Sequence, residues 1–556
     1  MMSRAHRDYV EALLAERAMP PAEVWKAAEA RLDRPIHEGL NSAQEAADRW
    51  ARDRARLAMI VRHPDGTSDR WTFAELSRAS SRLATAWRAA GLRRGDRVAA
   101  YVSQQIEAYI TALAAWRAGM VYMPLFAGFG PDALAQRING GEPAAVVVDH
   151  TLRARLERAL GTVRGDLRIY TVAGPAGRGL VCGDHSLWAE IEGHAAGTAV
   201  ENTAASDPAT LIYTSGTTGA PKGCVQPHSL LVSIQPFIRH TFALRPGDML
   251  FSGANPGWAY GLYTTGFGPM SLGHPRVVLS GDFDPHAWLK VFEEEQVTYV
   301  AAAPSAYRRL LQAARRSGLS ASVRGATSAG EPLDAPLAEA WRDLTGAGIQ
   351  DGYGQSEAGM VLANLAYDEK PAVPGALSSI VPGCEVVLVD DDGVPQAEQG
   401  IIALHRPKYL AATGYWNRDD LWAARWRGEY FLTGDVGRRD EDGRFRFVGR
   451  ADDLIVTSGY NVGPSEVEEL VLAHPGVLEA AVVGVPDPER GTVVRAVIVA
   501  NGQVPQDKVA AEVRRTVQDK LGRHAYPRII DFVDALPRTE TGKIQRNLLR
   551  SEYERS

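Results

Sequence analysis

Cysteine is scarce in this chain of 556 residues. Only Cys182, Cys224 and Cys384 occur, and they lie far apart in the sequence. Their spacing matches neither a zinc site nor a disulfide framework, so we expect neither kind of cross-link. A chain with so few cysteines, none of them at a paired spacing, is typical of a reducing compartment.

Long uncharged apolar runs are also missing. The most apolar region, residues 106–130, is interrupted by Glu107 and Arg117 and is too broken to span a bilayer. The N-terminal stretch MMSRAHRDYVEALLAERAMPP carries charges throughout and lacks the apolar core of a signal peptide. We therefore expect a soluble, cytoplasmic protein without a membrane partner.

Neither sign of charge dominates the composition. The chain has 61 basic and 67 acidic side chains, a formal net charge of -6. Because nucleic-acid binding depends on a basic surface, no nucleic-acid partner is expected. Hydrophobic residues make up 45% and charged residues 23%, as in ordinary globular proteins. The length predicts two to four domains.

Short apolar runs alternate with longer amphipathic ones from about Asp96 to Asp351. RVAAYV precedes IEAYITALAAWRAG, and VTYVAAA precedes SAYRRLLQAARR. This alternation predicts βα units with buried parallel strands. Beyond Asp351, the runs EVVLVDDDGVPQ and GIIALH predict a β-rich segment with hairpins.

A second pattern begins after GRFRFVGRADD, residues 443–453. LIVT and LEAAVVGV predict strands, whereas SEVEELVLA and VAAEVRRTVQDKL predict helices. We therefore predict an α/β protein with a large multi-sheet domain at residues 1–449. This domain would contain parallel βα units and, in addition, a β-rich subdomain. A hinge at 450–453 would connect it to a small, mobile α+β domain at 454–556.

The stretch YTSGTTGAPKG, residues 213–223, follows the predicted strand ATLIYT. Its glycines let backbone N–H groups turn toward one anion, and its hydroxyls and Lys222 add further donors. This chemistry suits a polyphosphate, although the pattern G-x-x-x-x-G-K-[ST] is absent. From this stretch alone, an exposed flexible loop is an equally good interpretation.

Three further stretches carry chemistry of the same kind. Ser356 and Glu357 in DGYGQSEAG can bind a phosphate oxygen and a Mg²⁺ ion, or form an ordinary polar turn. Asp435 and Arg450 flank a predicted hairpin, where a carboxylate at a strand end can accept ribose hydroxyls or form a solvated charge pair. Lys543 in TGKIQR alone predicts only a solvated side chain.

In this order, YTSGTTGAPKG, YGQSE, TGD, GRADD and TGKIQR resemble the acyl-adenylate-forming superfamily of acyl-CoA synthetases, luciferases and peptide-synthetase adenylation domains. The resemblance extends from about residue 40 to residue 550. It implies an enzyme in which a carboxylate attacks the α-phosphate of ATP, giving an acyl-adenylate and pyrophosphate. A thiol, usually that of CoA, then displaces AMP. Such chemistry depends on positioning and charge neutralisation.

The resemblance assigns roles to individual residues. It implies Lys543, Glu357 and Lys222 as catalytic residues, with Glu357 as the Mg²⁺ ligand. The residues implied to bind ATP or AMP are Thr214, Ser215, Gly216, Thr217, Thr218, Gly219, Lys222, Gly330, Glu331, Pro332, Asp351, Tyr353, Gln355, Ser356, Asp435 and Arg450. Among these, Tyr353 is expected to stack on adenine, and Asp435 and Arg450 to contact the ribose.

The remaining implied sites concern the hinge, CoA and the acid. Asp452 matches the hinge, and Gly459 and Tyr460 match the CoA tunnel. The acyl pocket is implied at Trp258, Ala259, Tyr260 and Gly354. Acetate-specific relatives carry tryptophan where this chain has Gly354, which implies an open pocket floor. Asn461 stands where some relatives have arginine, which puts one phosphate contact in doubt.

The identity of the acid is less clear from the residues. WAYGL is similar to benzoate-type ligases, and the C-terminal half to aminobenzoate and medium-chain acid ligases, so we expect an aromatic or medium-chain acid. Tyr263 and Phe267 recur at helical spacing, which is more typical of core residues than of a pocket.

Two other functions stay open. The adenylate could pass to a carrier-protein thiol, an amine or a small inorganic nucleophile; the chain ends soon after Lys543, so an appended carrier domain is not expected. A non-catalytic nucleotide-binding protein is the other alternative, although such a protein would not need all of Lys222, Glu357, Asp435 and Lys543. The oligomeric state is open, with a homodimer as one option.

Overall fold

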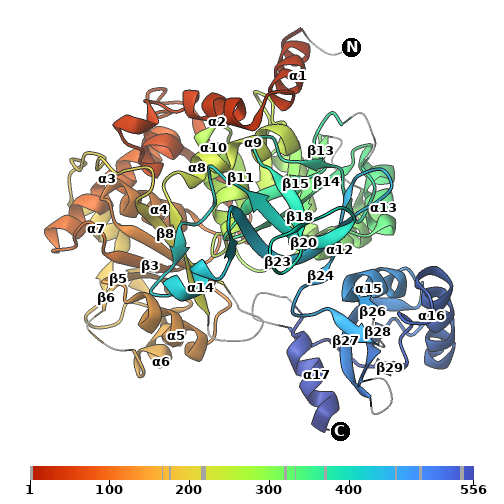
Figure 1. Ribbon diagram of the computed structural model, residues 1–556. Coiled ribbons are helices and arrows are strands. Elements are labelled where there is room, and N and C mark those ends of the chain that lie inside the picture. The colour runs from red at the N-terminus through yellow and green to blue at the C-terminus, as the bar shows by residue number, and fades with distance from the viewer. Residues whose placement is uncertain are drawn as a thin grey trace.

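The computed structural model describes residues 4–163, 165, 167–174, 177–214, 221–318, 322–331, 333–368, 372–457, 460–487, 491–538 and 544–555. The chain forms a large N-terminal part built on three sheets and a small C-terminal α+β part (Figure 1). This architecture confirms the predicted α/β class.

The first sheet has nine strands among the described residues. Its strand order is β17-β15-β14-β13-β12-β10-β11-β1-β2, parallel from β14 through β1 and antiparallel at both edges. The strands are Ser379–Ile380, Gly359–Ala363, Ile349–Gln355, Gly325–Ala329, Tyr299–Ala301, Leu250–Ser252, Arg276–Leu279, Leu57–Arg62 and Ser68–Thr72. β14 includes most of the motif DGYGQSE, which extends the strand predicted only up to Gln350.

The second sheet has eight described strands in the order β21-β9-β8-β4-β3-β5-β6-β7. They are Gly414–Tyr415, Lys222–Pro227, Pro208–Thr214, Val121–Leu125, Arg97–Tyr101, Ala145–Asp149, Arg168–Val172 and His185–Ser186. β8 through β7 are parallel, whereas β9 and β21 add antiparallel edge strands. The residues between β8 and β9 carry the glycine-rich motif.

Helix α4, Ile106–Arg117, explains the most apolar stretch of the sequence. All of its residues are buried, and it belongs to the core cluster that joins α3, Phe73–Ala89, to residues of the first and second sheets. Its two charged residues are paired: Arg117 forms an ion pair with Asp48, and Glu107 accepts a hydrogen bond from the Trp188 indole at 2.9 Å. A helix that is apolar all round therefore marks a core position here. Over the residues that the model describes, we find no helix with the length and apolarity that spanning a membrane requires.

The third sheet is antiparallel and contains the predicted hairpins. Its strand order is β16-β24-β23-β20-β18-β19, and β22 pairs with β23. The strands are Ala376–Leu377, Phe445–Arg450, Tyr430–Arg439, Gln399–His405, Val386–Val389, Pro395–Gln396 and Trp426–Arg427. Asp435 of β23 pairs in register with Arg450 of β24, the last residue of that strand.

Further helices pack around these sheets. They are α1 Arg4–Arg17, α2 Pro21–Ala30, α5 Pro131–Gly141, α6 Arg153–Leu160, α7 Leu187–Gly193, α8 Leu230–Ser233, α9 Gln235–Phe237, α10 Gly268–Ser271, α11 Pro285–Glu294, α12 Pro304–Ser317, α13 Ala335–Thr345 and α14 Asp419–Ala423, with π-helical segments η2 Gln44–Asp48, η4 Ile238–Phe242 and η5 Tyr260–Phe267. α1 and α2, drawn red, lie at the opposite end of the molecule from the C-terminal part (Figure 1).

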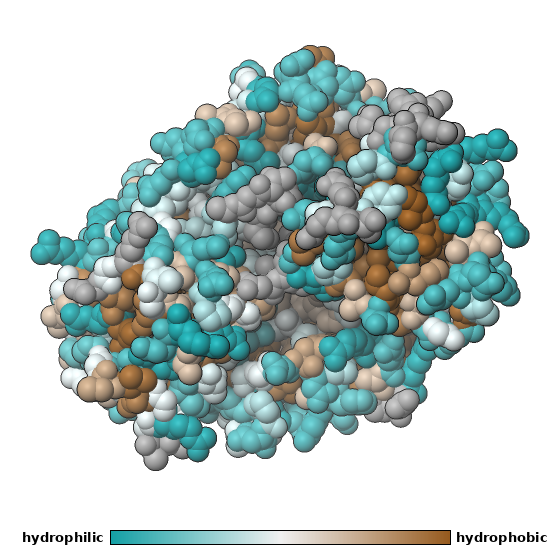
Figure 2. Space-filling view, turned by 90° about the horizontal axis from the view of Figure 1, so that it is seen from below, coloured by the Kyte–Doolittle hydropathy of each residue, from teal (hydrophilic) through white to brown (hydrophobic). Residues whose placement is uncertain are grey.

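The C-terminal part, drawn blue in Figure 1, follows the end of β24. Its strands are β25 Ile455–Thr457, β26 Tyr460–Val462, β27 Val477–Asp487, β28 Gly491–Ala500 and β29 Ile529–Phe532, and its helices are α15 Pro464–Leu472, α16 Gln506–Leu521 and α17 Arg546–Arg555. The face seen from below in Figure 2 is mostly hydrophilic and is hollowed near its centre.

The start of α15 lies directly against β24. A Cβ atom at Gly463 would stand 2.7 Å from the carbonyl oxygen of Val448, and one at Gly449 would stand 3.2 Å from Pro464 Cδ. The ion pair between Arg438 and Glu466, at 3.1 Å, adds a second contact between the two parts. The absence of side chains at the two glycines therefore permits this close approach.

Candidate active site

Part of the predicted site lies outside the described residues. These are Ser215, Gly216, Thr217, Thr218, Gly219, Pro332, Gly459 and Lys543. Their assignments stay predictions. What the structure does describe are the two strands that flank the glycine-rich motif: β8 ends at Thr214, β9 begins at Lys222, and these two residues are register partners. The Thr214 hydroxyl donates to the Lys222 carbonyl at 3.4 Å.

Glu357 lies in the turn between β14 and β15 and is only 8% exposed. Its Oε1 accepts a hydrogen bond from the Tyr415 hydroxyl at 2.7 Å. Burial, together with the nearby Glu357 carboxylate, raises the pKa of Tyr415, so its phenol stays protonated as a donor. The Lys222 ammonium lies 5.7 Å from the centre of the Tyr415 ring. The structure thus brings two of the predicted catalytic residues to the same tyrosine.

The turn at Ser356 is held against β9. Its carbonyl accepts hydrogen bonds from Gln226 Nε2 at 3.2 Å and from the Cys224 thiol at 3.5 Å. Burial raises the pKa of Cys224 well above its usual value, so the thiol remains neutral at this position. Because Tyr415 and Cys224 are register partners, β9 and β21 together position Ser356 and Glu357.

Asp435 occupies the interior of the long strand β23, not a strand end as predicted from the sequence. Its Oδ2 accepts from the Tyr353 hydroxyl at 2.7 Å and from Gln355 Nε2 at 2.5 Å. Burial raises the pKa of Asp435, while Arg450, whose Nη1 lies 3.5 Å from Oδ1, opposes that rise. Oδ1 is buried and accepts no hydrogen bond from the described residues, which leaves it free for a ligand hydroxyl.

Arg425 supports this arrangement and was not found from the sequence. Its guanidinium donates to the Gln355 side-chain oxygen at 3.2 Å and to the Thr433 carbonyl at 2.9 Å. Gln355 in turn donates to that same carbonyl at 3.0 Å. Tyr415 lies on β21 of the second sheet and Arg425 in the turn before β22 of the third, and no local motif in the sequence distinguishes them.

The predicted adenine side follows β13 and β14. Gly330 adopts a φ of 88°, and the Glu331 carboxylate accepts from the Ser305 backbone N–H at 3.1 Å and its hydroxyl at 3.2 Å. Asp351 is the register partner of Ser328 on the neighbouring strand. Burial raises the pKa of Asp351 to about 7.

The residues of the predicted acyl pocket are less buried than the other aromatic residues of the same segment. Trp258 lies against Phe126 and Phe129, with ring centres 5.5 and 5.6 Å apart. Ala259 and Tyr260 are half-buried at the start of η5. Tyr263 and Phe267 of the same segment are fully buried, as their helical spacing indicated.

The surroundings of Gly354 are not the open pocket floor that we expected. A Cβ atom there would collide with the Gly359 carbonyl oxygen and stand 2.7 Å from Met360 Cα. Glycine is needed at this position because β15 approaches β14 backbone to backbone, next to a register shift between Tyr353 and Gly354. The missing side chain therefore permits strand pairing, and no open space follows from it.

The predicted hinge begins where β24 ends. Arg450 Nε donates to Asp452 at 3.1 Å while the same guanidinium faces Asp435. Tyr460, predicted to contact CoA, begins β26 and pairs in register with Thr457. Arg450 therefore links the candidate ribose site to the hinge.

Among the residues that the structure describes, the candidate Mg²⁺ ligand Glu357 stands outside any cluster of metal-binding side chains. These residues contain no group of three or more His, Cys, Asp or Glu side chains arranged to hold a metal ion. A Mg²⁺ ion that accompanies a nucleotide, however, needs only one or two protein carboxylates besides the phosphates. The single buried carboxylate of Glu357 fits that requirement.

Comparison with known proteins places this geometry in a family. Residues 44–416 match the family model of the AMP-binding enzyme, and residues 466–543 match that of the AMP-binding enzyme C-terminal domain. Acetyl-coenzyme A synthetase of Bacillus subtilis (strain 168) is 31% identical over 521 residues, which cover 92% of this chain and 90% of that protein.

Solved structures resemble this chain over nearly its whole length. An acyl-CoA synthetase from Brucella canis is 35% identical, with a TM-score of 0.75, over 98% of this chain and 99% of that one. The anthranilate CoA ligase AuaEII in complex with anthranoyl-AMP is 27% identical, with a TM-score of 0.85, over 94% and 98% of the two chains. The chain therefore belongs to the family of AMP-binding enzymes.

Proposed function

We propose that this chain is an AMP-forming acid–CoA ligase, which converts an acid, ATP and CoA into acyl-CoA, AMP and pyrophosphate. The observation that carries the proposal is the pair of buried carboxylates on two sides of one site. Glu357 lies beside Tyr415 and Lys222, and Asp435 keeps one oxygen free beside Arg450. A phosphate–metal group and a ribose hydroxyl are the ligands that suit these two positions.

The chain's own residues have separate tasks in this reaction. Lys222 and the hydroxyls that follow Thr214 hold the phosphates, and Asp435 accepts from the ribose. Glu357 would hold a Mg²⁺ ion, which would supply charge neutralisation to the phosphates. Lys543 would place a cation between the acid and the α-phosphate, where negative charge accumulates during adenylation. Tyr415 keeps the Glu357 carboxylate oriented.

The second half-reaction requires a different arrangement of the small part. In our proposal, rotation at Asp452 withdraws Lys543 and brings Gly459 and Tyr460 to the CoA thiol. A hinge needs only a turn that absorbs backbone rotation. The turn after β24 is suited to this, because it joins the two parts directly at the residues that face the ribose site. The reaction involves neither a nucleic acid nor a membrane and is compatible with a homodimer.

The acid is proposed to be aromatic or of medium chain length. Trp258, which directly precedes Ala259 and Tyr260, packs in a cluster of aromatic rings with Phe126 and Phe129. Overall similarity to the anthranilate CoA ligase supports an aromatic acid. The B. subtilis relative acts on acetate by its name, so small acids belong in every comparison.

Release of AMP from ATP tests the proposal directly. A panel of acids from acetate to octanoate, with benzoate and aminobenzoates, is measured with and without CoA, alongside ATP–pyrophosphate exchange. Exchange together with CoA-dependent AMP release is the expected result. Exchange without CoA dependence would indicate another acceptor, such as a carrier-protein thiol, an amine or an inorganic nucleophile. Silence in both assays would leave a nucleotide-binding protein.

A further inference from the structure

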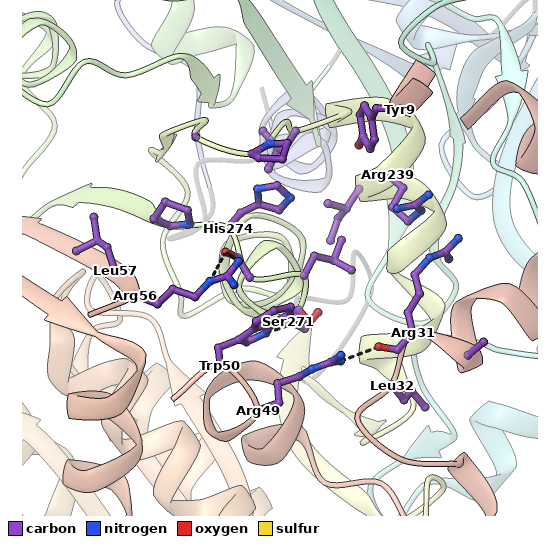
Figure 3. Close-up of a pocket in the computed structure, with 18 residues that line it drawn as sticks. Tyr9, Arg31, Leu32, Arg49, Trp50, Arg56, Leu57, Arg239, Ser271 and His274 are labelled. Carbon is purple, nitrogen blue, oxygen red and sulfur yellow. Dashed lines mark hydrogen bonds between the residues drawn. The ribbon is translucent and has the colours of Figure 1, made fainter. Parts of the chain in front are cut away.

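A cavity of about 720 Å³ lies away from the site described above (Figure 3). Its walls come from the N-terminal helical segments, from residues 238–247 and from residues 271–275. None of the residues assigned to ATP, acid or CoA lines it. We call it the arginine pocket, because Arg31, Arg49, Arg56 and Arg239 all contribute to its wall.

The arginine pocket carries an excess of positive charge. No Asp or Glu side chain lines it among the described residues. The carboxylates that pair with these arginines are not among the residues that line the cavity. Glu16 pairs with Arg31 and, at 2.9 Å, with Arg239. Glu45 pairs with Arg49 at 2.7 Å. Two carboxylates therefore pair with three of the four guanidinium groups.

Arg56 contributes the charge that lacks a carboxylate partner among the described residues. It donates to the Gly273 carbonyl at 2.7 and 3.3 Å, and its guanidinium lies 4.3 Å from the centre of the Trp50 ring. These contacts fix its position without neutralising it. Figure 3 shows the hydrogen bond to the 271–275 segment and the Trp50 side chain beside it.

Two other side chains in the wall, His274 and Arg31, also bear on the binding of an anion. Burial, with Arg56 and Arg239 nearby, lowers the pKa of His274 to about 4, so the ring is neutral at pH 7 and adds no positive charge. Arg31 Nη1 is buried and finds no acceptor among the described residues. An unmatched buried donor costs free energy that an anionic ligand would recover.

The rest of the wall is apolar. Trp50, Leu57, Ile238 and Leu244 face the cavity together with the arginines. Pockets of roughly 300–1,000 Å³ with apolar walls and a few fixed polar groups are typical of small-molecule sites. The arginines suit a carboxylate or phosphate, and the apolar wall suits a planar or aliphatic body.

We infer that the arginine pocket is a second ligand site, which binds an organic anion with an apolar body and a carboxylate or phosphate group. Its floor, residues 271–275, joins α10 to β11, and α10 directly follows the η5 segment that begins at Tyr260. The ligand therefore contacts the chain segment whose other end forms the proposed acyl pocket.

Isothermal titration calorimetry on the full chain tests this inference. A non-hydrolysable acyl-sulfamoyl adenosine first saturates the proposed active site, and 2-naphthoate, 2-naphthyl phosphate and uncharged 2-naphthamide are then titrated. We expect saturable binding of at least one anion with a stoichiometry near one, about tenfold or more tighter than the amide, and weaker at higher salt. The preferred anion identifies the ligand as carboxylate or phosphate. Equal binding of amide and anions, or no binding, would overturn the inference.

Three variants locate the binding event. Ala30→Trp places an indole into the pocket from the exposed last residue of α2 and should abolish binding. Arg56→Gln should weaken it about tenfold. Arg52→Gln is the matched control, since Arg52 is 73% exposed, pairs with Asp33 and lies outside the wall. Unchanged anion affinity in Ala30→Trp, or an equal loss in Arg52→Gln, would place the binding elsewhere.

Discussion

The two sides of the candidate active site are built differently. Glu357 and Tyr415 are held by strand pairing within the large domain, where β21 joins β9. Asp435 also lies in that domain, but its cationic neighbour Arg450 is the last residue of β24 and contacts Asp452 at the hinge. The phosphate side is therefore held within one domain, whereas the ribose side would change if the chain bent at the proposed hinge.

This difference separates two kinds of defect. A change on the phosphate side should affect the adenylation chemistry while leaving the domain arrangement intact. A change on the ribose side should affect nucleotide affinity and also the equilibrium between domain orientations.

Glu357→Gln should cause the largest loss, about 10³-fold in adenylation. The amide keeps the size of the side chain but removes the charge that is proposed to hold Mg²⁺. Pyrophosphate exchange measured over a range of Mg²⁺ concentrations should show a raised requirement, with an unchanged melting temperature. Glu385→Gln, a surface residue paired with His405 at 2.8 Å, is the control. Near-normal activity at ordinary Mg²⁺ would place the metal ligand elsewhere.

Lys543→Ala should reduce acyl-adenylate formation by about 10²-fold, the effect of losing one strong donor to the transition state. Thioester formation from preformed acyl-adenylate should continue at the normal rate. The two half-reactions are measured separately, with purified acyl-adenylate as substrate for the second. If both half-reactions fall equally, the lysine does not act in one orientation only.

Tyr415→Phe and Tyr353→Phe form a matched pair across the two sides. Each removes a hydroxyl that donates at 2.7 Å to a buried carboxylate, Glu357 in one case and Asp435 in the other. Each should cost about tenfold, because a charged acceptor loses a partner. Tyr415→Phe should raise the Mg²⁺ requirement, and Tyr353→Phe the KM for ATP. If both variants change the same kinetic parameter, the phosphate side and the ribose side do not differ in the way proposed.

Gly354→Ala tests whether this glycine serves the strand pair or the acid. The added methyl group would meet the backbone of Gly359 and Met360, so β14 and β15 must separate. We expect a loss of stability of about 1–3 kcal/mol, measured by denaturant unfolding, and a similar fall in kcat/KM for short and long acids. If the variant keeps its stability and loses kcat/KM only for long acids, the open pocket floor expected from the sequence is supported.

The last comparison concerns stability alone, through its pH dependence at Asp351. Its pKa rises from 3.8 in the unfolded chain to about 7 in the folded one, because of burial. Between these values the unfolded state loses its proton first, so stability falls as pH rises from about 4 to 7 and then levels off. Asp351→Asn should therefore melt at a higher temperature than wild type at pH 8, with no difference at pH 4. Asp519→Asn on α16 should show no such change, and a parallel shift at both pH values would exclude this titration as the cause.

Much of the fold follows from patterns that the sequence contains. The run AAVVVD becomes the fully buried strand β5, and the alternation of strands and helices becomes the parallel part of two sheets. The ordered set of motifs also singles out Glu357, Asp435 and Lys222 as candidates, since each lies in a distinctive stretch.

The partners of these residues could not be predicted in the same way. Tyr415 lies in a two-residue strand, too short for a periodic pattern, and Arg425 acts through Gln355, 70 residues away. Both contacts depend on how sheets are joined, a long-range property. Gly354 shows the opposite failure, because a glycine can mark either an empty pocket or a close backbone approach, and only the neighbouring strand distinguishes them.

The contact of Gly463 with Val448 offers a means of trapping one conformer. A methyl group at position 463 would meet the Val448 carbonyl oxygen at 2.7 Å, so Gly463→Ala disfavours the orientation seen here without touching a substrate. A destabilisation of about 1.4 kcal/mol shifts the ratio of two orientations tenfold. Small-angle scattering of this variant and of the wild-type chain would then show whether the second orientation of our proposal becomes populated.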